Sequence, residues 1–254
     1  MLRHHELSAE PRYLLRFCAT IASAALGLAS ACKEDAAAPG RITTDAPPRV
    51  NTPAPAAAPP GSGKSAAQAV VPAVVFLGDS LTAGFGLSES EALPAQIQKK
   101  FEAARLPYRS INAGRSADTS AGGLARLDWY FREGMALEAI VIGLGSNDAM
   151  RGLPLDALES NLRAIVRRIH ERKPDAKVFI WGLRTFPNLG PEYVAAFAEI
   201  FPRVAATENA ILIPFPLEGV AGNPELNQED GIHPTARGTE LVAQRIWDTL
   251  QQHL

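Results

Sequence analysis

Three side chains in the sequence have the types and spacing needed for nucleophilic catalysis. Ser80 stands in Gly78-Asp79-Ser80-Leu81, directly after the apolar run 73–77. Asp230 and His233 lie about 150 residues further along the chain. A serine hydroxyl needs a base to take its proton, and that base needs a partner that orients its ring. The pattern predicts a serine hydrolase with Ser80 as nucleophile, His233 as base and Asp230 as orienting carboxylate.

His233 is the best placed of the five histidines to act as the base. The other four lie in the leader, on an arginine-rich helix and at the end of the chain: His4, His5, His170 and His253. Each catalytic candidate also has a purely structural alternative. Ser80 and Asp230 could cap a helix or a turn, and His233 could be a turn residue before Pro234. The catalytic interpretation is favoured because all three residues occur together.

The segments between these residues alternate between strand and helix patterns. Short apolar runs predict strands at 73–77, 108–113, 137–144, 178–181 and 210–214. Apolar residues at spacings of three and four predict helices at 93–104, 120–131, 154–172, 193–206 and 235–252. This alternation predicts an α/β domain with a mostly parallel sheet and helices on both of its faces.

Polar or small residues directly follow the first three predicted strands. Ser80 follows the first strand, Gly114 the second and Asn147 the third. Ligands of parallel sheets bind at the carboxyl ends of the strands, so we expect the chemistry to collect at this edge. Three neighbouring aspartates are interpreted as hydrogen-bond acceptors that brace the loops there: Asp79, Asp118 and Asp148.

Four sequence blocks occur in a fixed order. They are Gly78-Asp79-Ser80-Leu81, residues 112–119 around Gly114, residues 143–148 around Asn147, and Asp230-Gly231-Ile232-His233. Together they resemble the blocks of SGNH (GDSL) hydrolases, most closely the bacterial thioesterase I, lysophospholipase and arylesterase group. The resemblance covers about residues 74–254. It implies a flavodoxin-like three-layer α/β/α sandwich with a five-stranded parallel sheet, and hydrolysis of fatty or aryl esters and thioesters.

The same resemblance implies three donors to the negative oxygen of the tetrahedral intermediate. They are the backbone N–H of Ser80, the backbone N–H of Gly114 and the side-chain amide of Asn147. Such donors are typically worth about 3 kcal/mol each. As alternatives, Gly114 could be a plain turn glycine and Asn147 could cap a turn. No metal or other cofactor is expected, because His233 has no histidine or cysteine neighbour at ligand spacing.

Composition argues against nucleic acid as a partner, against a membrane-spanning helix and against a cysteine-based site in the domain. A net charge of -2 and a pI near 6.2 provide no basic field for nucleic acid. The sequence lacks the roughly 18 consecutive apolar residues that indicate a membrane-spanning helix. Its two cysteines, Cys18 and Cys32, both lie near the start, so neither a disulfide scaffold nor a cysteine zinc site is expected in the domain.

The pattern of the first 71 residues predicts a leader followed by a tether. In residues 1–31, arginines precede the apolar stretch 17–31, as in a secretory signal peptide. The stretch ends in Leu28-Ala29-Ser30-Ala31-Cys32, which resembles a bacterial lipobox whose cysteine is lipidated. The alternative is an ordinary cleavage site beside an incidental cysteine. Residues 32–71 are rich in Ala and Pro and predict a disordered tether, leaving 72–254 as the hydrolase domain.

These features predict a cell-envelope enzyme that acts on a small-molecule or lipid ester. Lipidation of Cys32 would associate the chain with a membrane. Because Lys33 rather than aspartate follows Cys32, the outer membrane facing the periplasm is favoured over the inner one. Without lipidation the chain would be secreted or periplasmic. Two other functions are weighed on the same fold: a carbohydrate O-deacetylase of the envelope and a non-catalytic binding module.

Overall fold

A parallel five-stranded sheet forms the centre of the computed structural model, which describes residues 70–254. The strands are β1 (Ala73–Gly78), β2 (Arg109–Gly114), β3 (Leu137–Gly143), β4 (Lys177–Trp181) and β5 (Ile211–Ile213). They pair in the order β2-β1-β3-β4-β5, all parallel. This is the flavodoxin-like order, which reverses between β1 and β3. The predicted sheet is confirmed, with each strand end within one residue of its predicted place.

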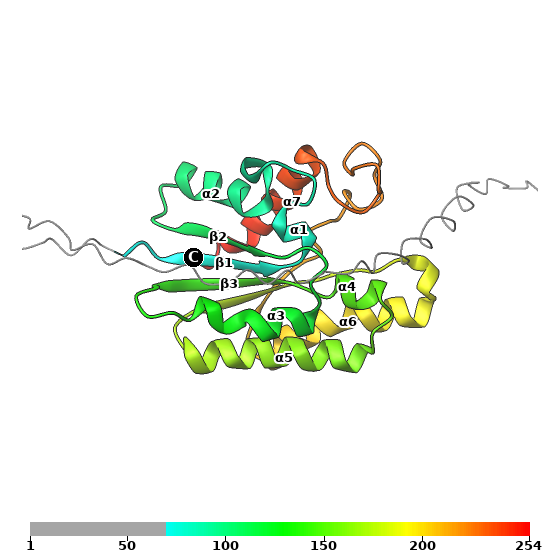
Figure 1. Cartoon of the computed structure of the whole chain (residues 1–254), viewed down its shortest axis with the longest axis horizontal. Coiled ribbons are helices and arrows are strands. Elements are labelled where there is room, and N and C mark those ends of the chain that lie inside the picture. The colour runs from blue at the N-terminus through cyan, green and yellow to red at the C-terminus, as the bar shows by residue number, and fades with distance from the viewer. Residues whose placement is uncertain (1–69) are drawn as a thin grey trace, which may run out of the picture. The chain divides into compact units, whose positions relative to one another are not determined.

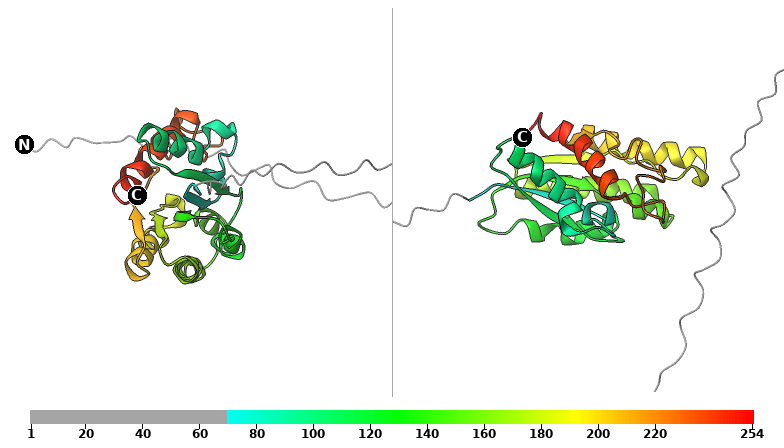
Figure 2. Two further views of the ribbon diagram at one scale, coloured as in Figure 1. Left: turned by 90° about the vertical axis from the view of Figure 1, so that its left-hand side faces the viewer. Right: turned by 90° about the horizontal axis from the view of Figure 1, so that it is seen from above.

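Helices cover both faces of the sheet, as Figure 1 shows. One face carries α2 (Leu93–Ala103) and α7 (Ala236–Leu250), which contact each other. The other carries α3 (Ser120–Arg126), α5 (Leu155–Arg172) and α6 (Pro191–Thr207), with α5 in contact with both neighbours. Figure 2 shows the same three layers from one end and from above. The predicted three-layer α/β/α arrangement is therefore confirmed.

The core lies between these layers. Every residue of β1 is buried, and β3 is buried over its last five residues. Large side chains at the centre are fully enclosed, among them Phe76, Phe101, Phe179 and Trp181. Each buried side chain of this size contributes about 1.5–3 kcal/mol relative to an exposed one. A core of this kind holds the strand ends, and the loops that follow them, in fixed positions.

Several short helices differ from the prediction. The helices α1 (Ser80–Ala83) and α4 (Ser146–Met150) were not predicted, because helices this short show no apolar period. The predicted helix 120–131 ends at Arg126 and continues as the 3₁₀ helix η2 (Leu127–Tyr130). Two glycines inside α3 lower its helix propensity. Two further 3₁₀ turns are η1 (Glu89–Glu91) and η3 (Pro187–Leu189).

The leader lies outside the described residues. The predicted signal peptide 1–31, Cys32 and all but the last two residues of the tether 32–71 fall there. Among the helices of residues 70–254, none is long and apolar enough to cross a membrane.

Candidate active site

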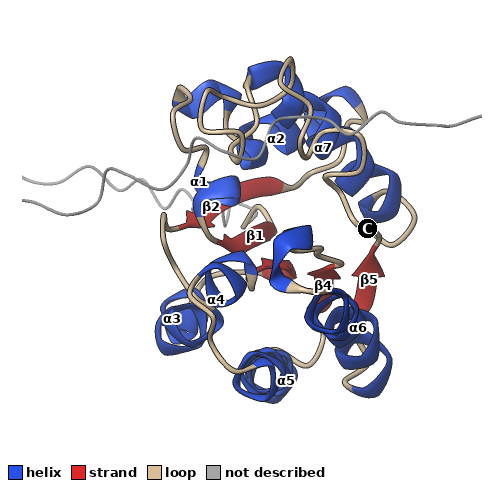
Figure 3. Ribbon diagram, turned by 90° about the vertical axis from the view of Figure 1, so that its right-hand side faces the viewer, coloured by secondary structure: helices blue, strands red, loops and turns tan. Residues whose placement is uncertain are grey.

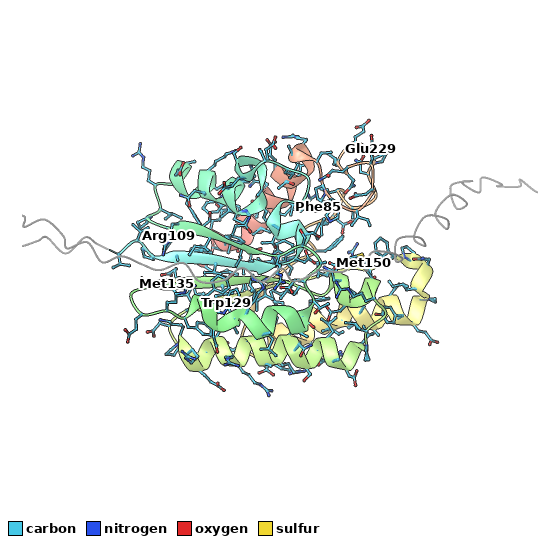
Figure 4. All side chains as sticks on the ribbon, viewed as in Figure 1. Phe85, Arg109, Trp129, Met135, Met150 and Glu229 are labelled. Atoms are coloured by element: carbon cyan, nitrogen blue, oxygen red, sulfur yellow. The ribbon has the colours of Figure 1, made fainter. Side chains whose placement is uncertain are left out.

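The predicted site residues collect at the carboxyl edge of the sheet. Helix α1 begins directly after β1, and α4 begins shortly after β3. Figure 3 looks onto this edge. In Figure 4, Phe85, Met150 and Glu229 lie at this end of the molecule, whereas Arg109, which starts β2, lies at the opposite end. The topology therefore places the predicted site residues at the edge of the sheet where ligands of parallel sheets usually bind.

A chain of two hydrogen bonds joins the three predicted catalytic side chains. The Nε2 atom of His233 lies 2.9 Å from Ser80 Oγ, and its Nδ1 atom lies 2.6 Å from Asp230 Oδ2. When Nδ1–H donates to the carboxylate, Nε2 is left to accept the proton of the serine hydroxyl. The imidazole is partly buried, with 17% of its side chain exposed. This is the arrangement that general-base activation of a serine requires.

The Asp230 carboxylate is held by its own loop. Its Oδ1 atom accepts the backbone N–H groups of Ile232 and His233 at 2.9 and 3.0 Å. Partial burial raises the pKa of Asp230, but the His233 hydrogen bond and these two N–H groups lower it by more, to about 2. Asp230 is therefore ionised at neutral pH, and its second oxygen is free to orient His233.

Ser80 is the first residue of α1. Asp79 caps this helix, because its Oδ1 atom accepts the backbone N–H of Leu81 at 3.0 Å. Gly84 ends the helix in the left-handed conformation, with φ +82°. The N–H groups in the first turn of a helix have no intrahelical acceptor. The N–H of Ser80 can therefore face a negative oxygen beside its own side chain.

The predicted donor Gly114 has a hydrogen-bond partner of its own in the structure. Its backbone N–H donates to Oδ1 of Asn112 at 2.9 Å, a local bond between residues two apart. The need for glycine has a different cause. A Cβ atom at this position would lie 2.2 Å from the backbone N of Ala83, so only glycine lets the end of β2 pack against α1.

Asn147 lies in α4 and is buried, with 7% exposure. Its Nδ2 atom donates to the backbone oxygen of Asp118 at 2.9 Å and to Asp79 Oδ2 at 3.3 Å. The second bond is long, so its hydrogen is the one more easily turned towards a substrate. The amide therefore braces two loops and also lies beside the capped start of α1.

The three aspartates beside the site accept hydrogen bonds, as predicted. Asp79 caps α1, and Asp148 accepts the backbone N–H and hydroxyl of Ser120 at 2.9 and 2.6 Å. Asp118 pairs with the buried Arg126 at 2.7 Å. Breaking a buried ion pair of this kind typically costs about 3–5 kcal/mol. These contacts fix the loops that carry the candidate catalytic groups.

Arg126 was missed by the sequence analysis. Besides Asp118, it donates to the backbone oxygen of Gly78 at 3.0 Å, at the end of β1. It thereby links the strand before Ser80 to the loop that contacts Asn147. No signal in the sequence indicated it, because Arg126 does not share the helix face of Leu124, Leu127 and Phe131 on which the helix was predicted.

Ala117 has an unusual backbone conformation in the loop after β2. Its φ is +64°, a value that residues with a side chain seldom adopt. Its carbonyl oxygen accepts a hydrogen bond from Arg151 at 2.6 Å, while the next residue, Asp118, accepts the Asn147 amide. In the described part of the chain, the N–H groups of Ser116 and Ala117 have no hydrogen-bond acceptor. Strained backbone of this kind is concentrated at functional sites.

Burial raises the pKa of Asp79 to about 6, against the opposing effects of the Leu81 N–H and of His233. A rise from 3.8 to about 6 corresponds to about 3 kcal/mol. Because the folded-state pKa lies above the unfolded one, this stability is present below pH 4 and is lost as the pH rises through 6. Asp79→Asn keeps the cap but cannot ionise.

Asp79→Asn should therefore gain stability relative to the wild type as the pH rises. We expect the difference in unfolding free energy to grow by about 2–3 kcal/mol between pH 4 and pH 8. Urea unfolding of both proteins at several pH values measures it. A difference that stays constant over this range would contradict a buried carboxyl with a raised pKa.

The described residues include no group of three or more His, Cys, Asp or Glu side chains placed to hold a metal ion.

Comparison with known families agrees with the sequence resemblance. The sequence model of the GDSL-like Lipase/Acylhydrolase family matches residues 76–241, more than half of the chain. The match includes Ser80, Asn147, Asp230 and His233, and lies wholly within the described residues.

Individual proteins are similar over nearly the whole described region. Esterase TesA of Pseudomonas aeruginosa is 39% identical over 184 residues, which are 72% of this chain and 90% of that protein. Thioesterase 1/protease 1/lysophospholipase L1 of Escherichia coli strain K12 is 33% identical over 178 residues, 70% of this chain and 83% of that protein. A crystal structure of TesA aligns with a TM-score of 0.67 and 39% identity, covering 72% of this chain and 99% of that one.

Proposed function

The chain belongs to the GDSL-like lipase/acylhydrolase family, and we propose that it hydrolyses carboxylic esters and thioesters through an acyl-enzyme on Ser80. The observation that carries the proposal is the pair of hydrogen bonds from Ser80 to His233 and from His233 to Asp230. The first of these bonds joins residues 153 apart in the sequence, and the second joins residues three apart.

The proposed reaction has two halves. In the first, His233 takes the hydroxyl proton of Ser80 as Oγ attacks the acyl carbon, and then gives that proton to the leaving alcohol or thiol. In the second, His233 takes a proton from the water that attacks the acyl carbon, and returns it to Ser80 Oγ as the acyl–oxygen bond breaks and the acid leaves. Asp230 stays ionised throughout, because its pKa is about 2, and stabilises the imidazolium that forms in each half.

The negative oxygen of each tetrahedral intermediate needs donors, and we assign it the Ser80 N–H and the Asn147 amide. In place of Gly114, whose N–H is already bonded, we assign the third donor to Ala117. This assignment is supported by its strained backbone and by its place next to the residue that contacts Asn147. A crystal structure of a phosphonate adduct on Ser80 tests it. The phosphonyl oxygen should lie about 2.7–3.1 Å from the Ala117 nitrogen; contact with the Gly114 nitrogen instead would refute it.

The proposed substrates are acyl or aryl esters and thioesters, including lysophospholipid-like molecules. Apolar side chains are exposed next to the candidate catalytic residues: Phe85 at 49%, Met150 at 43% and Ile232 at 40%. Exposed apolar groups that gather beside a polar site indicate an apolar ligand. Relatives with the printed names arylesterase and thioesterase 1/lysophospholipase L1 support the same classes.

A panel of chromogenic p-nitrophenyl esters of increasing acyl length tests this function. We expect hydrolysis of acyl groups longer than acetyl, and of acyl-thioesters. Activity on acetyl groups alone would favour a carbohydrate O-deacetylase. No hydrolysis of any ester or thioester would contradict the proposal and leave a binding module of the same fold.

Asn147→Ala separates a catalytic amide from a structural one. As an oxyanion donor, Asn147 acts mainly in the transition state, so its loss should lower kcat about 100–1000-fold with KM nearly unchanged. Asn161→Ala is a matched control. The Asn161 amide donates to the Ser120 hydroxyl at 3.0 Å and makes no hydrogen bond to Ser80, His233 or Asp230. If Asn147→Ala lost thermal stability but kept near-normal kcat, as expected for Asn161→Ala, the donor role would be withdrawn.

We further propose that the domain 72–254 works in the cell envelope, behind a signal peptide 1–31 and a tether 32–71. The lipobox-like sequence before Cys32 supports lipidation, and the acyl chains of a bacterial lipoprotein would anchor the chain firmly. Lys33 favours the outer membrane over the inner one, in a cell that has both.

Cys32→Ser in the full-length chain tests the anchor. Wild type should sediment with membranes, and the variant should appear in the soluble envelope fraction, as shown by cell fractionation and ester hydrolysis in each fraction. Equal partition of both proteins into the soluble fraction would show that residue 32 follows an ordinary cleavage site.

A further inference from the structure

Ser80 and His233 lie on two segments far apart in the sequence, 79–88 and 226–235, and these segments must keep a fixed position relative to each other for the two side chains to meet. Between residues 79–88 and residues 226–235 of the described chain, two hydrogen bonds cross. One is the Ser80–His233 bond, which changes during the reaction because its proton is transferred. The other runs from Gln228 to the backbone oxygen of Phe85. The second is therefore the polar link that persists through the catalytic cycle.

The Gln228 amide connects both sides at once. Its Nε2 atom donates to the backbone oxygen of Phe85 at 2.8 Å and to that of Pro234 at 3.0 Å. Its backbone N–H donates to the carbonyl of His233 at 2.7 Å, and Phe85 N–H donates to the carbonyl of Ser80 at 3.1 Å. An unbroken series of hydrogen bonds thus runs from the backbone of the nucleophile to the backbone of the base.

Packing around Gln228 fits the same role. A Cβ atom on Gly86 would lie 2.2 Å from Gln228 Oε1, so the loop after α1 leaves space that the glutamine fills. The ring of Phe85 lies over the imidazole of His233, with ring centroids 4.5 Å apart and an angle of 35° between the planes. Phe85 therefore contacts the loop 226–235 in two ways: its backbone oxygen accepts from Gln228, and its ring packs on His233.

We propose that Gln228 is a positioning residue, which holds His233 within hydrogen-bond reach of Ser80 by tying the loop 226–235 to the segment after α1. The inference rests on the hydrolysis proposed above. Gln228 contacts backbone groups rather than the reacting atoms, so it acts through His233. A displacement of about 1 Å between catalytic groups can cost on the order of 100-fold in rate.

Gln228→Met tests the pair of hydrogen bonds from the Gln228 amide to Phe85 and Pro234, here called the bridge. Methionine keeps the length of the side chain and lacks the N–H donors. We expect kcat on a p-nitrophenyl ester to fall about 10–100-fold, with KM within about twofold. The rate constant for inactivation by a fluorophosphonate should fall by a similar factor, since this reaction also needs the Ser80–His233 pair. A merely structural loss would lower the Tm and leave both rates unchanged in assays run well below it.

Gln98→Met is the matched control. The Gln98 amide also joins two elements through backbone groups, accepting from the N–H of Ser110 at 2.8 Å and facing the carbonyl of Tyr108 at 3.4 Å. Gln98 lies within α2, and its amide contacts the start of β2, at the edge of the sheet opposite the site. We expect Gln98→Met to lower the Tm with kcat retained.

Gly86→Ala supplies a second, independent test. The added methyl group collides with Gln228 Oε1, and the φ of +74° is unfavourable for alanine, so we expect a loss of kcat at least as large. Once the bridge is displaced, removing its donors should cost nothing more. The double variant Gly86→Ala/Gln228→Met should therefore match Gly86→Ala alone, the non-additivity expected for residues in contact.

Three outcomes would overturn the proposal: a loss of kcat below about fivefold in Gln228→Met, an equal loss in Gln98→Met, or losses that multiply in the double variant. Ser80→Ala, assayed in parallel, distinguishes this failure from that of the function itself. If Ser80→Ala is inactive while Gln228→Met retains kcat, the bridge alone is refuted. If Ser80→Ala remains active, the proposed function is refuted.

Discussion

Replacing Ser80 by alanine is expected to abolish ester and thioester hydrolysis while leaving the fold intact. Loss of a serine nucleophile typically lowers kcat by roughly three to six powers of ten. The Ser80 hydroxyl makes its side-chain hydrogen bond to His233, and removing one such bond costs only about 0.5–1.5 kcal/mol. The effect should therefore be catalytic. It is measured with purified variant free of wild-type enzyme, alongside thermal unfolding.

Ser146→Ala is the matched control for this experiment. Ser146 begins the short helix α4 after β3, much as Ser80 begins α1 after β1, but it makes no hydrogen bond to a histidine. We expect full activity and labelling by a fluorophosphonate for Ser146→Ala, and neither for Ser80→Ala. More than a few per cent of wild-type kcat in Ser80→Ala would show that another group is the nucleophile.

The sheet could be predicted because its strands carry a strong signal. The interior strand β1 is buried along its whole length, and its run of apolar residues is visible without the structure. The long helix α5 shows the spacing of three and four on one face, from Leu158 to Ile169. Buried strands that alternate with such helices leave few topologies other than a parallel sheet with helices on both faces.

The loops at the carboxyl edge were predicted less well, because their structure depends on contacts that the sequence does not display. Gly114 occupies the predicted place after β2, yet a side chain two residues earlier takes its N–H. Such local side-chain bonds compete with any other use of the backbone. Glycine is required there because a side chain would collide with the backbone of Ala83. That residue lies 31 positions earlier, so no local sequence pattern indicates the contact.

The link through Gln228 is harder still to predict. The residue stands two positions before Asp230 and has no type or spacing that suggests a role in catalysis. Its amide meets a backbone carbonyl 143 residues away, and a backbone acceptor leaves no trace in the sequence. By contrast, Asp230 and His233 could be paired from sequence alone, because three residues of separation allow one turn to bring them together.

Replacing Asp230 by asparagine is expected to lower kcat by about 10⁴-fold, because it changes the tautomer of His233. The asparagine oxygen can still accept the backbone N–H groups of Ile232 and His233, which turns its NH₂ group towards Nδ1. Nδ1 must then accept, so the proton moves to Nε2, and Nε2–H cannot take the proton of Ser80.

The variant should also lose stability at neutral pH. The pKa of Asp230 lies at about 2 in the folded chain, below the ordinary 3.8, so its ionised form contributes stability above pH 4 that is lost as the pH falls towards 2. The difference in Tm between wild type and Asp230→Asn should therefore shrink on acidification. This separates the two effects, since kcat measured at 25 °C and pH 8 reports on the tautomer.

Glu229→Gln is the control, because it makes the same change from carboxylate to amide one residue earlier, on an exposed side chain. Figure 4 shows Glu229 at the same end of the molecule as Phe85. We expect Glu229→Gln to keep kcat within about twofold. If Asp230→Asn retained more than a tenth of the wild-type kcat, His233 would not depend on this carboxylate for its tautomer, and another acceptor would have to orient the base.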